Sequence, residues 1–185
     1  NTFQINNGSN FSEMSRLAGV EATDWSWGAL IFDMENDGFK DLFVANGIYQ
    51  DLTDQDYLQY ASSEEIVQAM VSDEGVDYKK LIDIIPSNPI PNFAYQNKNG
   101  IRFEDVTEEY GLAKPSFSNG SAYGDLDNDG DLDLVVNNVN MPAFLYRNNA
   151  ESRAEQNYIS FSLRVDGDNT KAIDSKIWLK TDESS

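Results

Sequence analysis

Two acidic segments of this chain follow one pattern and lie a fixed distance apart. Residues 32–47 read FDMENDGFKDLFVANG, and residues 124–139 read GDLDNDGDLDLVVNNV. Both contain the spacing D-x-[DE]-x-D-G-x-x-D, and an offset of 92 residues brings them into register. The same offset pairs glycines further upstream, such as Gly28 with Gly120. Repeated matches at one offset indicate an internal repeat, which limits the chain to architectures built from copies of one small unit.

The sequence around the acidic segments predicts a mostly β fold. The runs WGALIF, DLFVAN, NFAYQN and RFEDVT are short, contain aromatic or β-branched residues, and are separated by Gly, Asn and Asp. Such runs are typical of short strands joined by turns, so each unit is expected to contain four strands. Residues 1–13 resemble only the last two strands of a unit, and we therefore expect the chain to begin within a repeat.

The first unit carries a long insertion within about residues 47–91. Asn46 and Phe93 are 47 positions apart, whereas the corresponding Asn138 and Phe144 are 6 positions apart, so about 41 residues are extra. Apolar residues in the insertion follow a helical spacing, and these are Ile66, Val67, Met70, Val71, Leu81, Ile82, Ile84 and Ile85. The insertion is therefore expected to form two short helices.

Local signals give the expected limits of these helices. Ser62 with Glu65 forms a capping-box pattern at the start of the first helix, and Gly75 can end it. The second helix is expected to run from Asp77 until Pro86 ends it. The two helices could pack on each other, cover the sheets, or dock a protein. The tyrosines of the insertion fit a small core and an interface equally well, and these are Tyr57, Tyr60 and Tyr78.

The acidic spacing places carboxylates at positions 1, 3, 5 and 9 of each loop, with a backbone carbonyl at position 7. Ca²⁺ takes about six to eight oxygen ligands at about 2.4 Å, and Gly at position 6 permits the sharp reversal that gathers them. The pattern therefore predicts two calcium sites. The expected ligands of the first are Asp33, Glu35, Asp37 and Asp41 with the carbonyl of Phe39. Those of the second are Asp125, Asp127, Asp129 and Asp133 with the carbonyl of Asp131.

Three other interpretations of the acidic loops are weaker. A solvated Asp-Gly hairpin turn would need no metal. Mg²⁺ demands stricter octahedral geometry and keeps several waters, so it fits this spacing less well. An EF-hand needs a bidentate Glu at position 12 and flanking helices, but position 12 is Val44 in one loop and Val136 in the other, both within expected strands.

The composition excludes several classes of function. The 13 basic and 32 acidic residues give a net charge of −19, which argues against nucleic acid or an anionic membrane surface as a partner. The chain has no Cys and no His, so it lacks disulfides, thiolate metal sites, the usual zinc ligand and the commonest general base. No apolar run approaches the roughly 20 residues that span a bilayer.

The acidic segments and the tail of the sequence resemble those of known families. The segments GDLDNDGDLDLVVNN and FDMENDGFKDLFVAN, together with YRNN and FEDVTEEYGL, look like FG-GAP/VCBS repeats, the blades of integrin-α-type β-propellers. The tail NYISFSLRVDGDNTKAIDSKIWL is similar to the opening of the ASPIC/UnbV domain of cartilage acidic protein-like chains. The resemblance implies a calcium-stabilised propeller that is secreted or exposed at the cell surface, including outer-membrane-associated versions in bacteria.

The resemblance also implies a division of the chain. Residues 1–15 would end a preceding blade, 16–109 would form a blade with a calcium loop and the insertion, 110–153 would form a second such blade, and 154–185 would begin the ASPIC/UnbV-like β domain. Propellers close a ring of about four to eight blades. We therefore expect flanking sequence or a partner chain to cover the exposed blade edges.

The expected function is that of a non-catalytic binding or scaffold module for a protein or glycan partner. The alternative is an accessory or catalytic part of a polysaccharide-degrading enzyme. Acid–base chemistry usually needs a carboxylate in an apolar cleft or a His or Tyr beside a cation, and the recognisable acids here belong to the metal loops. Trp25 and Trp27 could form a stacking platform for sugar rings, although packing within the blade is the more usual role of such residues.

Overall fold

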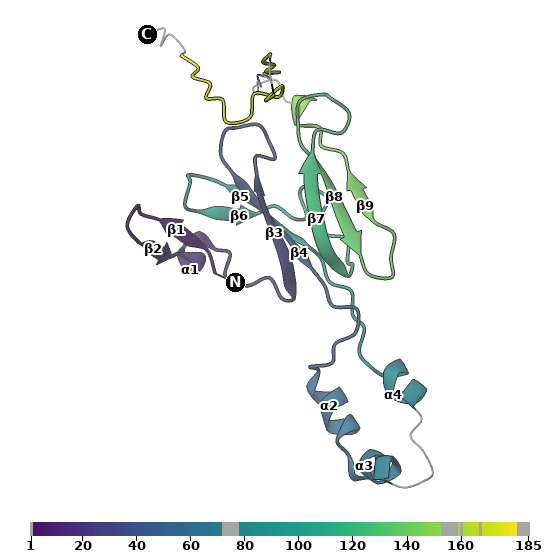
Figure 1. Cartoon of the computed structure of the whole chain (residues 1–185). Helices are drawn as coiled ribbons and strands as arrows, with labels where there is room; N and C mark the ends of the chain where they lie inside the picture. The colour runs from purple at the N-terminus through teal and green to yellow at the C-terminus, as the bar shows by residue number, and fades with distance from the viewer. Residues whose placement is uncertain (1, 72–77, 153–158, 160, 167, 181–185) are drawn as a thin grey trace.

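The computed structural model of this protein describes residues 2–71, 78–152, 159, 161–166 and 168–180. Within these ranges the chain forms three separate antiparallel sheets and several short helices (Figure 1). The mostly β fold predicted from the sequence is confirmed. None of the described sheets closes into a ring.

The first sheet is a hairpin near the N-terminus, and the second is the largest. The hairpin consists of β1 (Gln4–Asn6) and β2 (Phe11–Glu13), followed by the single-turn helix α1 (Ser15–Ala18). The second sheet has the order β3 (Ser26–Phe32), β4 (Asp41–Asn46), β5 (Phe93–Asn97) and β6 (Phe103–Asp105). The third has the order β7 (Ser118–Gly124), β8 (Asp133–Asn138) and β9 (Phe144–Tyr146), and the 3₁₀ helix η1 (Ala150–Ser152) follows it.

The second and third sheets begin with hairpins of identical register. Phe32 lies opposite Asp41 across β3 and β4, and Gly124 lies opposite Asp133 across β7 and β8. Each hairpin also has a β-bulge at its far end, just before Gly28 in one and Gly120 in the other. These equivalent positions are 92 residues apart, so the sequence offset corresponds to equivalent positions in space. The acidic segments occupy the β3–β4 and β7–β8 connections.

Strand β4 is buried on both faces because a different neighbour covers each one. Its residues alternate between the two faces, as in any strand. Phe43 and Ala45 join a core that includes Val136 of the third sheet, whereas Leu42 and Val44 join a second core with the α1 segment. The second sheet is therefore packed between the N-terminal segment and the third sheet.

The second and third sheets contact each other mainly through their first strands, β3 and β7. Strands β3 and β7 lie side by side (Figure 1). The ring of Phe32 on β3 stacks on the ring of Tyr123 on β7, with centroids 4.5 Å apart and an angle of 14° between planes. This contact places the two acidic loops next to each other at one end of the sheets.

The insertion between β4 and β5 forms helices, but their limits differ from the sequence prediction. The structure has α2 (Gln55–Ala61), α3 (Glu64–Val71) and α4 (Tyr78–Asp83), and α2 was not expected. Ser62 does not begin α3. Its hydroxyl donates to the carbonyl of Leu58 at 2.7 Å and so ends α2, and Ser63 is the residue that precedes α3. The expected boundary residues Gly75 and Asp77 lie outside the described residues.

The three helices project away from the sheets (Figure 1). No residue of α2 or α4 is buried. Leu58 of α2, Val67 of α3 and Ile82 of α4 are 44%, 47% and 52% exposed. The described helical residues therefore do not build a core of their own. None of the described helices is long and apolar enough to cross a membrane.

The base of the insertion, unlike the helices, packs on the third sheet. The ring of Tyr49 meets Phe117 edge-on, with centroids 5.2 Å apart. Ile90 and Ser116 exchange two backbone hydrogen bonds at 3.1 and 2.9 Å. The two ends of the insertion are thus held by the segment that leads into β7 of the third sheet.

Two tryptophans flank the same region. Trp25 and Trp27 are 38% and 59% exposed, and the indole N–H of Trp27 donates to the carbonyl of Gly47. That bond fixes the ring at the start of the insertion while leaving much of it open to solvent. Both roles considered from the sequence, packing and stacking, are compatible with this geometry.

The segment expected to begin a further β domain, 154–185, contains no strand among its described residues 159, 161–166 and 168–180. Large apolar side chains there are exposed, among them Phe161, Leu163, Ile177 and Trp178. The ASPIC/UnbV-like β domain therefore stays a prediction from sequence.

Candidate metal centre

Both acidic loops turn sharply at the same two positions. Asn36 and Gly38 in the first loop, and Asn128 and Gly130 in the second, have positive φ angles between 58° and 95°. Glycine accepts this left-handed conformation without a steric penalty, and Asn tolerates it better than most residues. The Gly at position 6 thus has the role expected from the sequence, and the Asn at position 4 adds a second reversal that the sequence analysis did not consider.

The aspartate at position 9 fastens each loop to its sheet. Asp41 accepts the backbone N–H of Met34 at 2.7 Å and that of Asn97, at the end of β5, at 2.9 Å. In the second loop Asp133 accepts the backbone N–H of Leu126 at 3.0 Å and that of Asn148, just after β9, at 2.9 Å. Both aspartates are buried. Each aspartate therefore uses both of its carboxylate oxygens to hold the loop. If either residue also binds a metal, the same oxygens must accept these hydrogen bonds and coordinate the ion.

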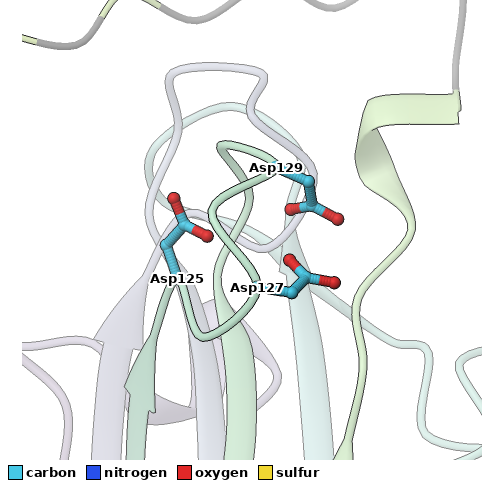
Figure 2. A group of neighbouring side chains, drawn as sticks. All are labelled: Asp125, Asp127 and Asp129. Atoms are coloured by element: carbon cyan, nitrogen blue, oxygen red, sulfur yellow. The ribbon is translucent and has the colours of Figure 1, made fainter.

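The second loop gathers three carboxylates. Asp125, Asp127 and Asp129 each offer one oxygen, and these oxygens all lie within 4.8 Å of one another. Figure 2 shows the three side chains pointing toward one another across the loop. Asp125 and Asp127 are exposed and Asp129 is half-buried, so an ion can reach them from solvent. This is the group expected from positions 1, 3 and 5.

The first loop does not gather its acids in the same way. Asp33 accepts the backbone N–H groups of Asp37 at 3.0 Å and Gly38 at 2.9 Å, and Asp37 accepts that of Phe39 at 2.8 Å. The groups of three converging acids found within the described ranges all belong to the second loop and its surroundings. Backbone donors in the first loop occupy both oxygens of Asp33 and one oxygen of Asp37.

Glu35, the expected ligand at position 3 of the first loop, points into the core. Its side chain is buried and accepts a hydrogen bond from the hydroxyl of Tyr110. It lines a cavity of about 210 Å³ between the second and third sheets, together with Met34, Leu132 and Tyr146. Glu35 would have to leave Tyr110 in order to bind an ion in the loop.

The side chain of Arg147 lies against the second loop. The Arg147 guanidinium contacts Asp127 at 2.8 Å through Nε and Asp129 at 3.1 Å through Nη2. The hydrogen bond to Asp129 and the charge of Asp127 raise the pKa of Arg147 above its usual value. Sequence reasoning did not single out this residue. The pairing of β8 with β9 would have indicated it, because Tyr146, the last residue of β9, lies opposite Leu134 and the residue that follows it is therefore next to the loop.

Asp131 was expected to contribute its backbone carbonyl to the metal site, but its side chain also has an unusual environment for an aspartate. The carboxylate is fully buried, and its Oδ2 accepts the backbone N–H groups of Ala150 at 2.7 Å and Glu151 at 3.3 Å. Burial raises the pKa of Asp131 to about 6. A buried carboxylate is costly unless it is paired, so this position has a specific role in joining the loop to η1.

Side-chain amides tie the two acidic loops to each other. The amide of Asn36 in the first loop donates to the carbonyl of Gly130 in the second at 3.2 Å. The amide of Asn148 donates to the carbonyls of Met34 at 2.7 Å and Leu132 at 3.2 Å, one in each loop. These bonds connect the two loops both directly, through Asn36, and by way of Asn148.

No family model matches the chain, and no curated protein matches it significantly. The resemblance to FG-GAP/VCBS repeats and to the ASPIC/UnbV domain thus stays a prediction.

Proposed function

We propose that this chain is a calcium-binding, non-catalytic module of an extracellular or cell-surface β-propeller. The observation that carries the proposal is the convergence of Asp125, Asp127 and Asp129 within 4.8 Å on a solvent-accessible loop. Like charges this close repel one another unless a cation neutralises them. Arg147 supplies one positive charge to the loop, and several negative charges remain.

The donor set fits calcium. It consists of carboxylate and carbonyl oxygens only, since the chain has no His and no Cys, and oxygen donors are the preference of a hard cation. Asp125, Asp127 and Asp129 would hold the ion together with the carbonyl of Asp131, while Asp133 keeps the loop in shape. Bound calcium would supply a fixed positive charge that holds the carboxylates together, which is a structural rather than a catalytic contribution.

The first loop would bind a second Ca²⁺ less tightly. Its acids Asp33 and Asp37 accept backbone hydrogen bonds, and Glu35 is directed to Tyr110. An ion there must compete with these bonds, whereas the acids of the second loop face one another. The carbonyl of Phe39 and the carboxylate of Asp41 complete the expected ligand set.

The scaffold role is supported by the packing of the sheets. Strands β3 and β7 lie side by side as the first strands of successive four-stranded and three-stranded sheets, an arrangement compatible with neighbouring propeller blades. The insertion supports a protein partner, because its described helices expose Leu58, Val67 and Ile82 rather than packing them on the sheets. A glycan is the other class of partner, and the exposed part of Trp27 favours it.

Calorimetric titration with Ca²⁺ tests the metal proposal. The unaltered chain should bind calcium, and Asp125→Asn should weaken binding by at least about tenfold because a charged ligand is lost. Asp83→Asn is the matched control, since Asp83 is an exposed aspartate at the end of α4. The control should bind as the unaltered chain does. Absence of any binding heat, or equal affinity in both variants, would contradict the proposal.

A further inference from the structure

A second group of acids lies next to the second loop and shares one member with it. Asp129, Asp131 and Glu151 each offer an oxygen, and these oxygens are all within 4.8 Å of one another. Asp131 is at position 7 of the loop, and Glu151 belongs to η1, 20 residues further along the chain. The group therefore joins the acidic loop to the segment that follows the last strand of the sheet.

The environment of the Asp131 carboxylate is a second observation that points to a ligand, independent of the closeness of the three acids. Its side chain is fully buried. Oδ2 accepts two backbone hydrogen bonds, but Oδ1 is also buried and has no hydrogen-bond partner within the described part of the chain. Buried polar atoms nearly always have a partner, and a charged oxygen is the costliest kind to leave without one. Such an atom indicates a ligand.

The nearest positive side chain does not supply that partner. Arg147 contacts Asp127 and Asp129, and its Nη2 reaches Glu151 only at 4.0 Å. Its hydrogen bonds and ion pairs in the described residues do not include Asp131. Within the described part of the chain, no basic side chain therefore pairs with the Asp131 carboxylate.

We propose that Asp129, Asp131 and Glu151 form a second divalent-cation position, adjacent to the one inside the loop, with Asp129 contributing to both. The ligands are hard oxygens, so the position would take Ca²⁺. An ion there would link the loop to η1 and so to the chain that leaves the sheet. The inference rests on the proposed calcium-binding function only through the shared Asp129, because Asp131 and Glu151 lie outside the group of Asp125, Asp127 and Asp129.

Native mass spectrometry of the full chain tests this by counting bound ions at the lowest Ca²⁺ concentration that fills the unaltered chain, where a position that binds about tenfold more weakly is left largely empty. Glu151→Gln removes an exposed charged ligand and keeps the backbone N–H that Asp131 accepts, and it should carry one ion fewer than the unaltered chain. Asp125→Asn, which affects only the loop position, should also carry one fewer. The double variant should carry two fewer. Glu108→Gln makes the same substitution at an exposed glutamate outside both groups and should keep the full count.

Two results would overturn the inference. Glu151→Gln could keep the full count while Asp125→Asn loses an ion, in which case calcium binding stands and the second position does not exist. The double variant could lose only the one ion that each single variant loses, which would mean one shared ion. If instead no ion binds at Asp125, Asp127 and Asp129, the proposed function fails and the result is distinguishable. Asp125→Asn would then keep the full count, and Glu151→Gln alone would lose an ion.

Discussion

Asp133 accepts the backbone N–H of Asn148 at 2.9 Å and thereby closes the second acidic loop against the chain that follows β9. Its other oxygen accepts the N–H of Leu126 at 3.0 Å. Asp133→Asn replaces one acceptor oxygen with an NH₂ group that faces an N–H donor. Because hydrogen bonds to a charged group contribute about 1.5–3 kcal/mol each, we expect a loss of about 3 kcal/mol in the free energy of unfolding.

Urea denaturation in the presence of a chelator measures this loss without a contribution from calcium. Asp127→Asn is the matched control, since Asp127 is exposed and its ion pair with Arg147 lies at the surface. Exposed ion pairs contribute about 0–1 kcal/mol, so the control should change little. Equal losses in both variants would show that Asp133 does not have the fastening role described here.

Arg147 is expected to oppose calcium binding in the second loop. Its guanidinium contacts two of the proposed ligands, Asp127 and Asp129, so an incoming ion must displace it or bind beside a positive charge. Arg147→Gln should tighten calcium binding roughly fivefold, which corresponds to about 1 kcal/mol. Calorimetric titration measures the change, and Arg147→Lys should show less of it because the charge is kept. Weaker binding in Arg147→Gln would mean that the guanidinium orders the carboxylates for the metal.

Gly47 stands where the insertion leaves β4, and no side chain fits there. Its φ is 142°, and a Cβ atom would lie 2.6 Å from Cα of Phe117 and 2.8 Å from the backbone N of Ser118. Gly47→Ala should therefore cost about 2 kcal/mol or more, because backbone atoms of the third sheet would have to move. Gly28→Ala is the control, since nothing lies within 4 Å of its Cβ position. Thermal unfolding compares them, and similar melting temperatures would contradict the close packing of the two sheets.

The helices of the insertion are expected to be dispensable for folding. A Gly-Ser linker in place of residues 52–85 removes them but keeps the contact of Tyr49 with Phe117 and the bonds between Ile90 and Ser116. Because α2 and α4 have no buried residue, the melting temperature and the calcium affinity should change little. A protein that co-purifies with the unaltered chain should be lost. Retention of that protein would show that it docks elsewhere, and a large drop in stability would show that the helices support the sheets.

Much of the sheet arrangement follows from the sequence because the repeat is local and periodic. The offset of 92 residues relates Asp41 to Asp133, and the structure pairs them with Phe32 and Gly124 in equivalent registers. The short apolar run of β4, bounded by Asp41 and Asn46, likewise indicates a strand. Where the signal depends on a short polar pattern, as at Ser62, the prediction was one residue away from the observed start of α3.

The candidate site was predictable only for residues that lie within one loop. Glu35 occupies a ligand position in the pattern, yet the core offers it the hydroxyl of Tyr110, which is 75 residues away and has no counterpart in a local motif. Glu151 was missed for the same reason. It meets Asp131 only because β9 returns the chain to the loop. Contacts between residues far apart in the sequence could therefore not be predicted from the spacing of acids within one loop.

The melting temperature with and without calcium tests the central claim most directly. If the second loop binds the ion in the folded state only, calcium at about 100 times its dissociation constant should stabilise the chain by about 2.7 kcal/mol. For a chain of this size that corresponds to a rise of about 5–10 °C over the value in excess chelator. Asp129→Ala should remove most of the rise. Identical melting curves in calcium and in chelator would contradict the account.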